Sequence, residues 1–125
     1  MRNIRGMLAL TALALALPAA AQAPLKLIVG FPPGATSDTM TRAIAEGMRT
    51  HVDRTIVVEN RPGGGGLLAA KLVKAAPPDG NTLLMTPFGT MLQPHSVKAA
   101  DFNPLTDFTP VTQIATFDIA FAIGP

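Results

Sequence analysis

The 125-residue sequence contains no cysteine, and that absence rules out two kinds of covalent bond. No disulfide can staple the fold, even in a compartment where disulfides persist. A lipid anchor of the kind that is attached to cysteine cannot be added either. We therefore expect the mature chain to be soluble and to have no stable membrane anchor.

A strong excess of one charge is also missing once the first residues are set aside. The sequence has 10 Lys and Arg against 8 Asp and Glu, and Arg2 and Arg5 account for the difference. The 6 Phe are scattered, and no basic stripe is present. A nucleic-acid partner is not expected, because such a partner needs a concentrated positive surface. The roughly one hundred residues behind the amino-terminal segment suit one small domain.

Residues 1–23 have the pattern of a cleavable signal peptide. Arg2 and Arg5 precede an uncharged run over 7–17, and small residues follow. A membrane-spanning helix would need about 20 apolar residues, and this run is shorter. We expect cleavage before Gln22 or before Pro24. Cleavage before Gln22 is the sounder choice, because proline fixes the backbone and removes an N–H where the peptidase must hold the chain.

Behind this segment, apolar runs alternate with helical patterns and with turns rich in Gly and Pro. Such alternation predicts an α/β fold with a parallel sheet that is buried on both faces. One apolar stripe is predicted at Met40, Ala43, Ile44, Gly47 and Met48, and another at Leu68, Leu72 and Ala76. Strands are predicted over 25–29, 55–59 and 82–86, with one or two further strands around 111–114 and 119–123. Helices are predicted behind a cap at Thr36, Ser37 or Asp38, over 67–76 and around 89–97.

The loop over residues 30–37 is suited to an anion. In a parallel sheet, ligands sit beyond the carboxyl ends of the strands, and this loop leads from such an end into a helix. The first-turn N–H groups of a helix are unpaired and carry partial positive charge. Gly34 and Ala35 leave room, Thr36 and Ser37 add hydroxyls, and Asp38 can cap the helix or hold amide donors. The alternative is an ordinary strand–helix turn with a good cap.

A second loop of interest contains four consecutive glycines, Gly63 to Gly66, before a helix. Glycine lets the backbone approach a ligand closely and adopt positive φ. No Gly-Lys-Ser/Thr follows, and the third glycine of a dinucleotide motif would fall at Leu68 or Ala69. A nucleotide cofactor is therefore not expected, and a flexible turn remains the alternative.

The sequence makes no positive case for an enzyme or a metal site. Ser37 and His51 are separated by a predicted helix of about 20 Å, too far for proton transfer even with Asp53 nearby. His95 is isolated, and the two His do not have metal-ligand spacing. No catalytic residue, metal or cofactor is assigned.

Four motifs resemble those of a known family. They are Phe-Pro-Pro-Gly at 31–34 with Asp38 and Arg42 behind it, Val-Glu-Asn-Arg-Pro-Gly at 58–63, Ala-Pro-Pro-Asp-Gly-Asn-Thr-Leu-Leu at 76–84 and Asp-Phe-Thr-Pro-Val at 107–111. In these motifs and their order, the chain resembles the substrate-binding proteins of tripartite tricarboxylate transporters, the Bug or TctC-like family. It departs from the family pattern at Ala35, Asn81 and Gln93.

The resemblance implies a class II periplasmic-binding-protein-like fold, with two lobes that close on a di- or tricarboxylate or related acid and deliver it to membrane permease subunits. Residues 24–125 would form the first lobe only, truncated, with a parallel-rich sheet and flanking helices. Backbone amides and bridging waters of that lobe would hold the ligand. The residues that the resemblance assigns to ligand binding are Phe31, Pro33, Gly34, Ala35, Thr36, Ser37, Asp38, Gly63, Gly64, Gly65, Gly66, Thr86, Phe88, Gly89 and Thr90.

Three other interpretations stay open on the sequence alone. The chain could be a periplasmic ligand sensor that signals to a membrane sensor kinase, an exported hydrolase or isomerase that uses the same cleft, or a non-functional truncated fragment. With half of a cleft, we expect the chain alone to be poorly stable and to bind weakly or not at all.

Overall fold

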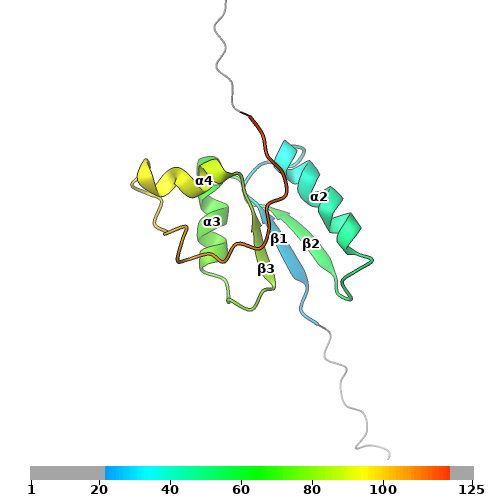
Figure 1. The fold of residues 1–125 in the computed structure, drawn as a ribbon. Coiled ribbons are helices and arrows are strands. Elements are labelled where there is room, and N and C mark those ends of the chain that lie inside the picture. The colour runs from blue at the N-terminus through cyan, green and yellow to red at the C-terminus, as the bar shows by residue number, and fades with distance from the viewer. Residues whose placement is uncertain (1–21, 119–125) are drawn as a thin grey trace, which may run out of the picture.

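A computed structural model of the chain describes residues 22–118 (Figure 1). Most of the predicted signal peptide, 1–21, and the predicted strand at 119–123 lie outside the described residues. In chain order the elements are β1 (Leu25–Val29), α2 (Thr36–Met48), β2 (Ile56–Asn60), the 3₁₀ helix η1 (Gly64–Gly66), α3 (Leu67–Lys74), β3 (Thr82–Met85), α4 (Phe88–Leu92) and the 3₁₀ helix η2 (Gln93–His95).

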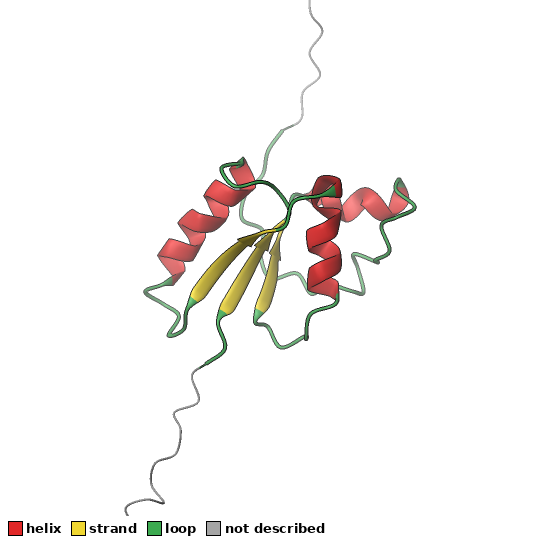
Figure 2. Cartoon of the chain, turned by 180° about the vertical axis from the view of Figure 1, so that it is seen from behind, coloured by secondary structure: helices red, strands yellow, loops and turns green. Residues whose placement is uncertain are grey.

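The three strands form one parallel sheet in the order β2-β1-β3, with β1 in the middle. Leu25 of β1 aligns with Ile56 of β2, and Lys26 aligns with Thr82 of β3. The first three predicted strands are confirmed; β2 lies one residue later than predicted, and β3 ends one residue earlier. Because the strands are parallel, their carboxyl ends meet at one edge of the sheet, and the following loops start side by side (Figure 2).

The two longer helices cover opposite faces of the sheet (Figures 1 and 2). Helix α2 packs against β1 and β2, and α3 packs against β1 and β3. Leu83 joins the apolar cluster on the α2 side, whereas its neighbour Leu84 joins the cluster on the α3 side. The buried members are Leu25, Leu27, Ala45 and Ile56 on the α2 side, and Ala70, Ala100 and Phe102 on the α3 side.

The predicted face of α2 is partly wrong. Asp38, Thr41 and Ala45 are its buried residues, whereas Ala43 and Gly47 are exposed. The helix is rotated about its axis relative to the prediction because hydrogen bonds hold the Asp38 carboxylate inside the fold. The predicted face was chosen from apolar residues alone, so it could not include a buried carboxylate. A buried polar group therefore sets this face.

The predicted face of α3 is also partly wrong. Leu68 is 54% exposed, and Ala69 and Ala70 are buried instead. A Cβ on Gly30 would lie 3.3 Å from the Ala69 Cβ, so β1 and α3 approach too closely for a larger side chain. The small residues face the sheet because the backbones meet there.

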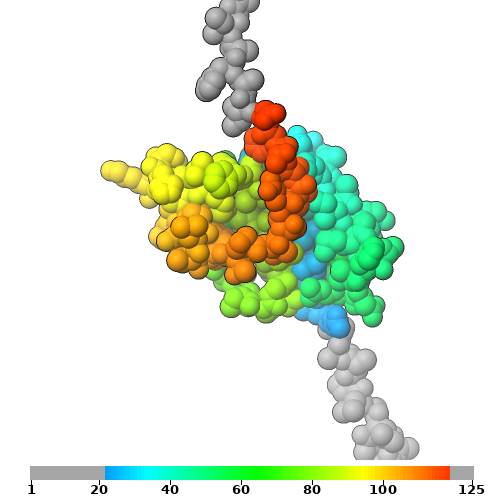
Figure 3. Space-filling model, in the orientation of Figure 1, coloured from blue at the N-terminus to red at the C-terminus, as the bar shows by residue number. Residues whose placement is uncertain are grey.

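Residues after β3 form short helices and then an extended tail. Helices α4 and η2 confirm the short helix predicted around 89–97, and residues 102–107 have no regular secondary structure. The strand predicted over 111–114 is wrong: these residues are extended and exposed, without a strand partner among the described residues. Figure 3 shows this segment, in orange to red, on the surface of the molecule. Within residues 22–118, no helix has the length and apolar character needed to cross a membrane.

Candidate functional site

The carboxyl edge of the sheet is the edge at which the three parallel strands end. From there the chain continues in different directions after neighbouring strands. Strand β1 continues into α2, whereas β3 continues into α4, whose Met91 packs into the cluster on the α3 side. β1 and β3 are neighbours, so their loops diverge across the sheet. Open α/β sheets bind ligands at such a switch point.

The loops after β1 and β2 touch at two glycines. A Cβ on Gly30 would lie 2.6 Å from the Cα of Gly66, closer than any side chain permits. A Cβ on Gly66 would lie 3.6 Å from the Phe31 ring. The Pro-Pro-Gly loop and the tetraglycine loop therefore lie at the same end of the sheet, as the sequence predicted.

The tetraglycine loop has a defined left-handed backbone. Gly63, Gly64, Gly65 and Gly66 have φ of 149°, 57°, 65° and 94°. Residues with a Cβ rarely adopt these angles, so the run of glycines is required by the conformation. The turn is closed by a hydrogen bond of 3.1 Å from the Gly66 N–H to the Gly63 carbonyl.

The segment after β3 holds the tetraglycine loop from a third side. The Thr90 hydroxyl donates to the Gly65 carbonyl at 2.8 Å, and Thr90 is only 3% exposed. The Gln93 side-chain amide donates to the Gly64 and Gly65 carbonyls at 2.9 and 3.1 Å. Thr90 thus holds the tetraglycine loop through a hydrogen bond. Gln93 holds it as well, and it is a site residue that was not predicted from the sequence. No local pattern indicated it, because its contacts lie almost thirty residues away in sequence.

The start of α2 differs from the predicted cap. Its N-cap is Ala35, which provides no side-chain hydrogen bond, so Thr36, Ser37 and Asp38 are not the cap. Asp38 instead reaches back from the first turn, and its Oδ2 accepts the Gly34 N–H at 2.8 Å. The expectation that Asp38 could hold an amide donor is confirmed, while the expected side-chain cap is wrong.

Asp38 is the centre of a polar network. Arg42 Nε donates to its two carboxylate oxygens at 3.0 and 3.1 Å, and Asn60 Nδ2 donates to Oδ1 at 2.8 Å. Asn60 Nδ2 also donates to the Phe31 carbonyl at 3.1 Å, and Arg42 donates to Asn60 Oδ1 at 3.0 Å. The i, i+4 spacing of Asp38 and Arg42 could have indicated this pair from sequence, but nothing local indicated Asn60.

The network keeps the Asp38 carboxyl ionised and balances its negative charge with the positive charge of Arg42. The Arg42 guanidinium, the Gly34 amide and the Asn60 amide lower the pKa of the Asp38 carboxyl from 3.8 to about 2. The side chain is only 4% exposed, and its charge is paired with Arg42. A negative ligand near the start of α2 therefore meets a neutral ion pair.

Several N–H groups at this edge have no acceptor among residues 22–118. They include the first-turn amides of Thr36, Ser37 and Asp38 in α2, and the amides of Gly64 and Gly65. Helix starts of this kind carry partial positive charge and accept anions. The edge therefore presents main-chain donors from two neighbouring loops.

The remaining predicted residues surround these donors loosely. Pro33 and Gly89 are exposed, and Phe88 is 71% exposed. Thr86 is half-buried, and its hydroxyl contacts the Pro87 carbonyl at 3.3 Å. Pro33 and Thr86 lie on loops that follow β1 and β3, and Phe88 and Gly89 begin α4. Among residues 22–118, none of the four forms a hydrogen bond with the tetraglycine loop.

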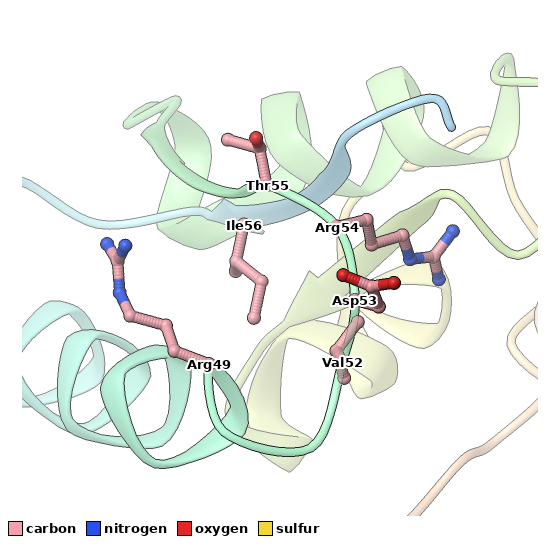
Figure 4. A pocket seen from close by; sticks show the side chains of 6 residues that line it. All are labelled: Arg49, Val52, Asp53, Arg54, Thr55 and Ile56. Carbon is pink, nitrogen blue, oxygen red and sulfur yellow. The ribbon is translucent and has the colours of Figure 1, made fainter. Parts of the chain in front are cut away.

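Two hollows on the described surface lie away from the carboxyl edge. One of about 430 Å³ lies at the amino end of β2 and is lined by Arg49, Val52, Asp53, Arg54, Thr55 and Ile56 (Figure 4). A second of about 350 Å³ runs between α2 and β2. Both border an edge strand, and neither contains a predicted ligand-binding residue.

Within residues 22–118, Ser37 and His51 lie at opposite ends of α2. Ser37 lies in the first turn of α2, and His51 lies beyond its last turn, where its Nδ1 contacts Thr50 Oγ1 at 2.8 Å. Among the described residues, no group of three or more His, Asp and Glu could hold a metal ion.

Comparison with known proteins agrees with this architecture. The arrangement is that of periplasmic-binding-protein-like α/β folds. The solved structure of the periplasmic binding protein BugD superposes with a TM-score of 0.66 and 36% identity, over 70% of this chain and 29% of that one. The chain belongs to the tripartite tricarboxylate transporter receptor family, TctC, whose signature matches residues 40–125.

Curated relatives give the same assignment. A UPF0065 protein encoded in the tcbD-tcbE intergenic region of a Pseudomonas species is 34% identical over 74% of this chain and 28% of its own length. Protein BugT of Bordetella pertussis is 29% identical over 82% of this chain and 32% of its own length. The chain thus spans about a third of the length of these relatives. The family is one of solute-binding receptors, not of enzymes.

Proposed function

We propose that this chain is the ligand-holding first lobe of a periplasmic receptor that captures a small carboxylate for a tripartite tricarboxylate transporter. The proposal assigns residues 24–125 to that lobe and residues 1–23 to a cleaved signal peptide. Membrane permease subunits would receive the solute. The family assignment supports the receptor role, and the chemistry of the carboxyl edge supports a carboxylate.

The observation that carries the proposal is the gathering of unpaired amides at two touching loops. Thr36 and Ser37 start α2, and Gly64 and Gly65 belong to the loop that touches its approach segment through Gly30 and Gly66. A carboxylate oxygen accepts several N–H bonds and is favoured by the helix dipole. The acid in the first turn of α2, Asp38, is already neutralised by Arg42.

The remaining predicted residues have secondary roles in this proposal. Pro33 and Ala35 shape the first loop, and Phe88 and Gly89 border the third. Thr86 and Thr90 position the chain behind them. Because the opposing lobe of such a receptor would supply the other wall of the cleft, we expect weak, millimolar binding by this lobe alone.

Saturation-transfer NMR with the chain tests the ligand class. Succinate and citrate are compared with succinamide, which resembles succinate in size but has no carboxylate. Transfer to succinate and citrate, but not to succinamide, is the expected result. Equal transfer to the amide and the acids, or none to either acid, would contradict the proposal.

A further inference from the structure

The Pro-Pro turn of the first loop is tied to the fold on both sides of its prolines. On the amino side, the Phe31 carbonyl accepts from Asn60 Nδ2 at 3.1 Å. On the carboxyl side, the Gly34 N–H donates to Asp38 Oδ2 at 2.8 Å. Pro32 and Pro33 lie between these ties and have no N–H to donate. Side-chain groups of α2 and β2 therefore fix the path of the turn.

These two ties are parts of one network. Asn60 Nδ2, which holds Phe31, also donates to Asp38 Oδ1 at 2.8 Å. The Arg42 guanidinium contacts Asp38 at 3.0 Å and Asn60 Oδ1 at 3.0 Å, so it fixes both side chains relative to each other. Because each of the three side chains bonds to the other two, loss of any one member removes a hydrogen bond from both of the others.

We propose that Asp38, Arg42 and Asn60 form a loop clamp, a set of positioning residues that sets the ligand-receiving shape of the first loop without touching the ligand. This inference rests on the proposed function. Both Asp38 oxygens are occupied by protein donors, and the side chain is nearly buried. The clamp also binds the Phe31 carbonyl, an acceptor that would otherwise repel a carboxylate. The Thr36 and Ser37 amides lie outside the clamp and are left for a ligand.

The clamp has an electrostatic consequence. Arg42 neutralises an acid that lies in the first turn of α2, next to the amides that would receive the ligand. Without Arg42, the Asp38 charge would be unbalanced and would repel an anion. Removing both charges together should restore neutrality, although it does not restore the hydrogen bonds.

Hydrogen exchange of the full chain tests the clamp without any ligand. In Asn60→Ala and in Asp38→Asn, the Gly34 and Ala35 amides should exchange about tenfold faster, the expected cost of losing charge-assisted bonds. Amides in β1 should not change. Arg49→Gln is the matched control, because Arg49 forms an exposed pair with Glu46 on the same helix. If Asp38→Asn does not fold, the exchange rates of Gly34 and Ala35 in Asn60→Ala test the clamp by themselves. Exchange at Gly34 that rises no more than in the control, or that rises equally in β1, would overturn the clamp.

Citrate titrations of variants that change the charges of the clamp separate positioning from general stability. Arg42→Gln should weaken citrate binding about tenfold, the cost of one extra unit charge near a trianion in water. Adding Asp38→Asn to that variant should recover part of the affinity, although stability falls further. A purely structural role predicts that the double variant binds no better than the single one, and that result would overturn the positioning role. If wild type does not bind citrate, the proposed function fails with this acid, while hydrogen exchange still decides the clamp.

Discussion

Gly30 and Gly66 stand on different loops, yet a Cβ on Gly30 would lie 2.6 Å from the Cα of Gly66. The same Cβ would lie 3.3 Å from Ala69, at the start of α3. This contact sets the distance between the first two loops of the carboxyl edge. It also explains why α3 presents alanines to the sheet.

Gly30→Ala should therefore destabilise the fold. We expect a loss of about 1–3 kcal/mol, because the backbone atoms that it meets cannot move aside as a flexible side chain can. Gly47→Ala is the control, since its Cβ meets nothing within 4 Å, and it lies inside α2. That change should stabilise by about 0.5–1 kcal/mol. Urea unfolding measures both, and equal effects of the two substitutions would contradict the close approach.

Gly66→Ala should cost more than Gly80→Ala. Both glycines have positive φ, 94° and 75°, and alanine is strained by about 1–2 kcal/mol at such angles. Only at Gly66 would the new Cβ also meet Thr90 Oγ1, at 2.9 Å. Thermal unfolding of the two variants isolates this extra contact. A Gly80 variant at least as unstable as the Gly66 variant would mean that Thr90 does not press on the loop.

The Asp38 carboxyl predicts an acid-dependent part of the stability. Its folded pKa of about 2 lies below the model-peptide value of 3.8, so the folded state favours the ionised form. This contribution is fully present above about pH 4 and is lost as the pH falls towards 2. The difference in stability between wild type and Asp38→Asn should therefore shrink over that window. Lowered pKa values of Asp79 and Asp107 affect both proteins alike, so they cancel in the comparison.

Circular dichroism of urea unfolding at pH 6 and pH 3 measures this difference. A gap between wild type and Asp38→Asn that stays constant between these pH values would show that Asp38 is not held ionised by the fold.

Phe102 should anchor the segment that follows η2. It is 6% exposed, and its ring meets Phe108 edge-on, with centroids 5.5 Å apart. Phe102→Ala should cost about 3–5 kcal/mol, the usual penalty for a lost buried aromatic ring. Leu105→Ala, at a side chain that is 89% exposed, should change stability by less than about 0.5 kcal/mol. Similar unfolding midpoints for the two variants would place Phe102 outside the core.

The strands and the edge on which the loops meet could be predicted from sequence, because both follow from local rules. Runs such as Leu25–Val29 and Ile56–Asn60 consist mostly of apolar or β-branched residues, and parallel strands place their carboxyl ends together. Local rules of this kind could not show whether residues 111–114 form a strand. A strand requires a hydrogen-bonded neighbour, and residues 111–114 have none among those described.

The packing of the site depended on contacts that sequence patterns do not encode. Leu68 fits an apolar stripe, but the approach of Gly30 to Gly66 turns alanines toward the sheet instead. Asn60 and Gln93 bind loops that are more than twenty residues away in the chain. Such long-range hydrogen bonds appear only when the backbone has been placed in three dimensions.

The proposed function depends most on where a carboxylate meets the chain. Amide-resolved NMR during a citrate titration locates that point directly. The largest shifts should fall on Thr36, Ser37, Gly64 and Gly65, and they should weaken with added salt because the attraction is electrostatic. Shifts confined to Arg49, Arg54 and the rest of the hollow at the amino end of β2, with none at the two loops, would contradict the assignment of the carboxyl edge as the ligand site.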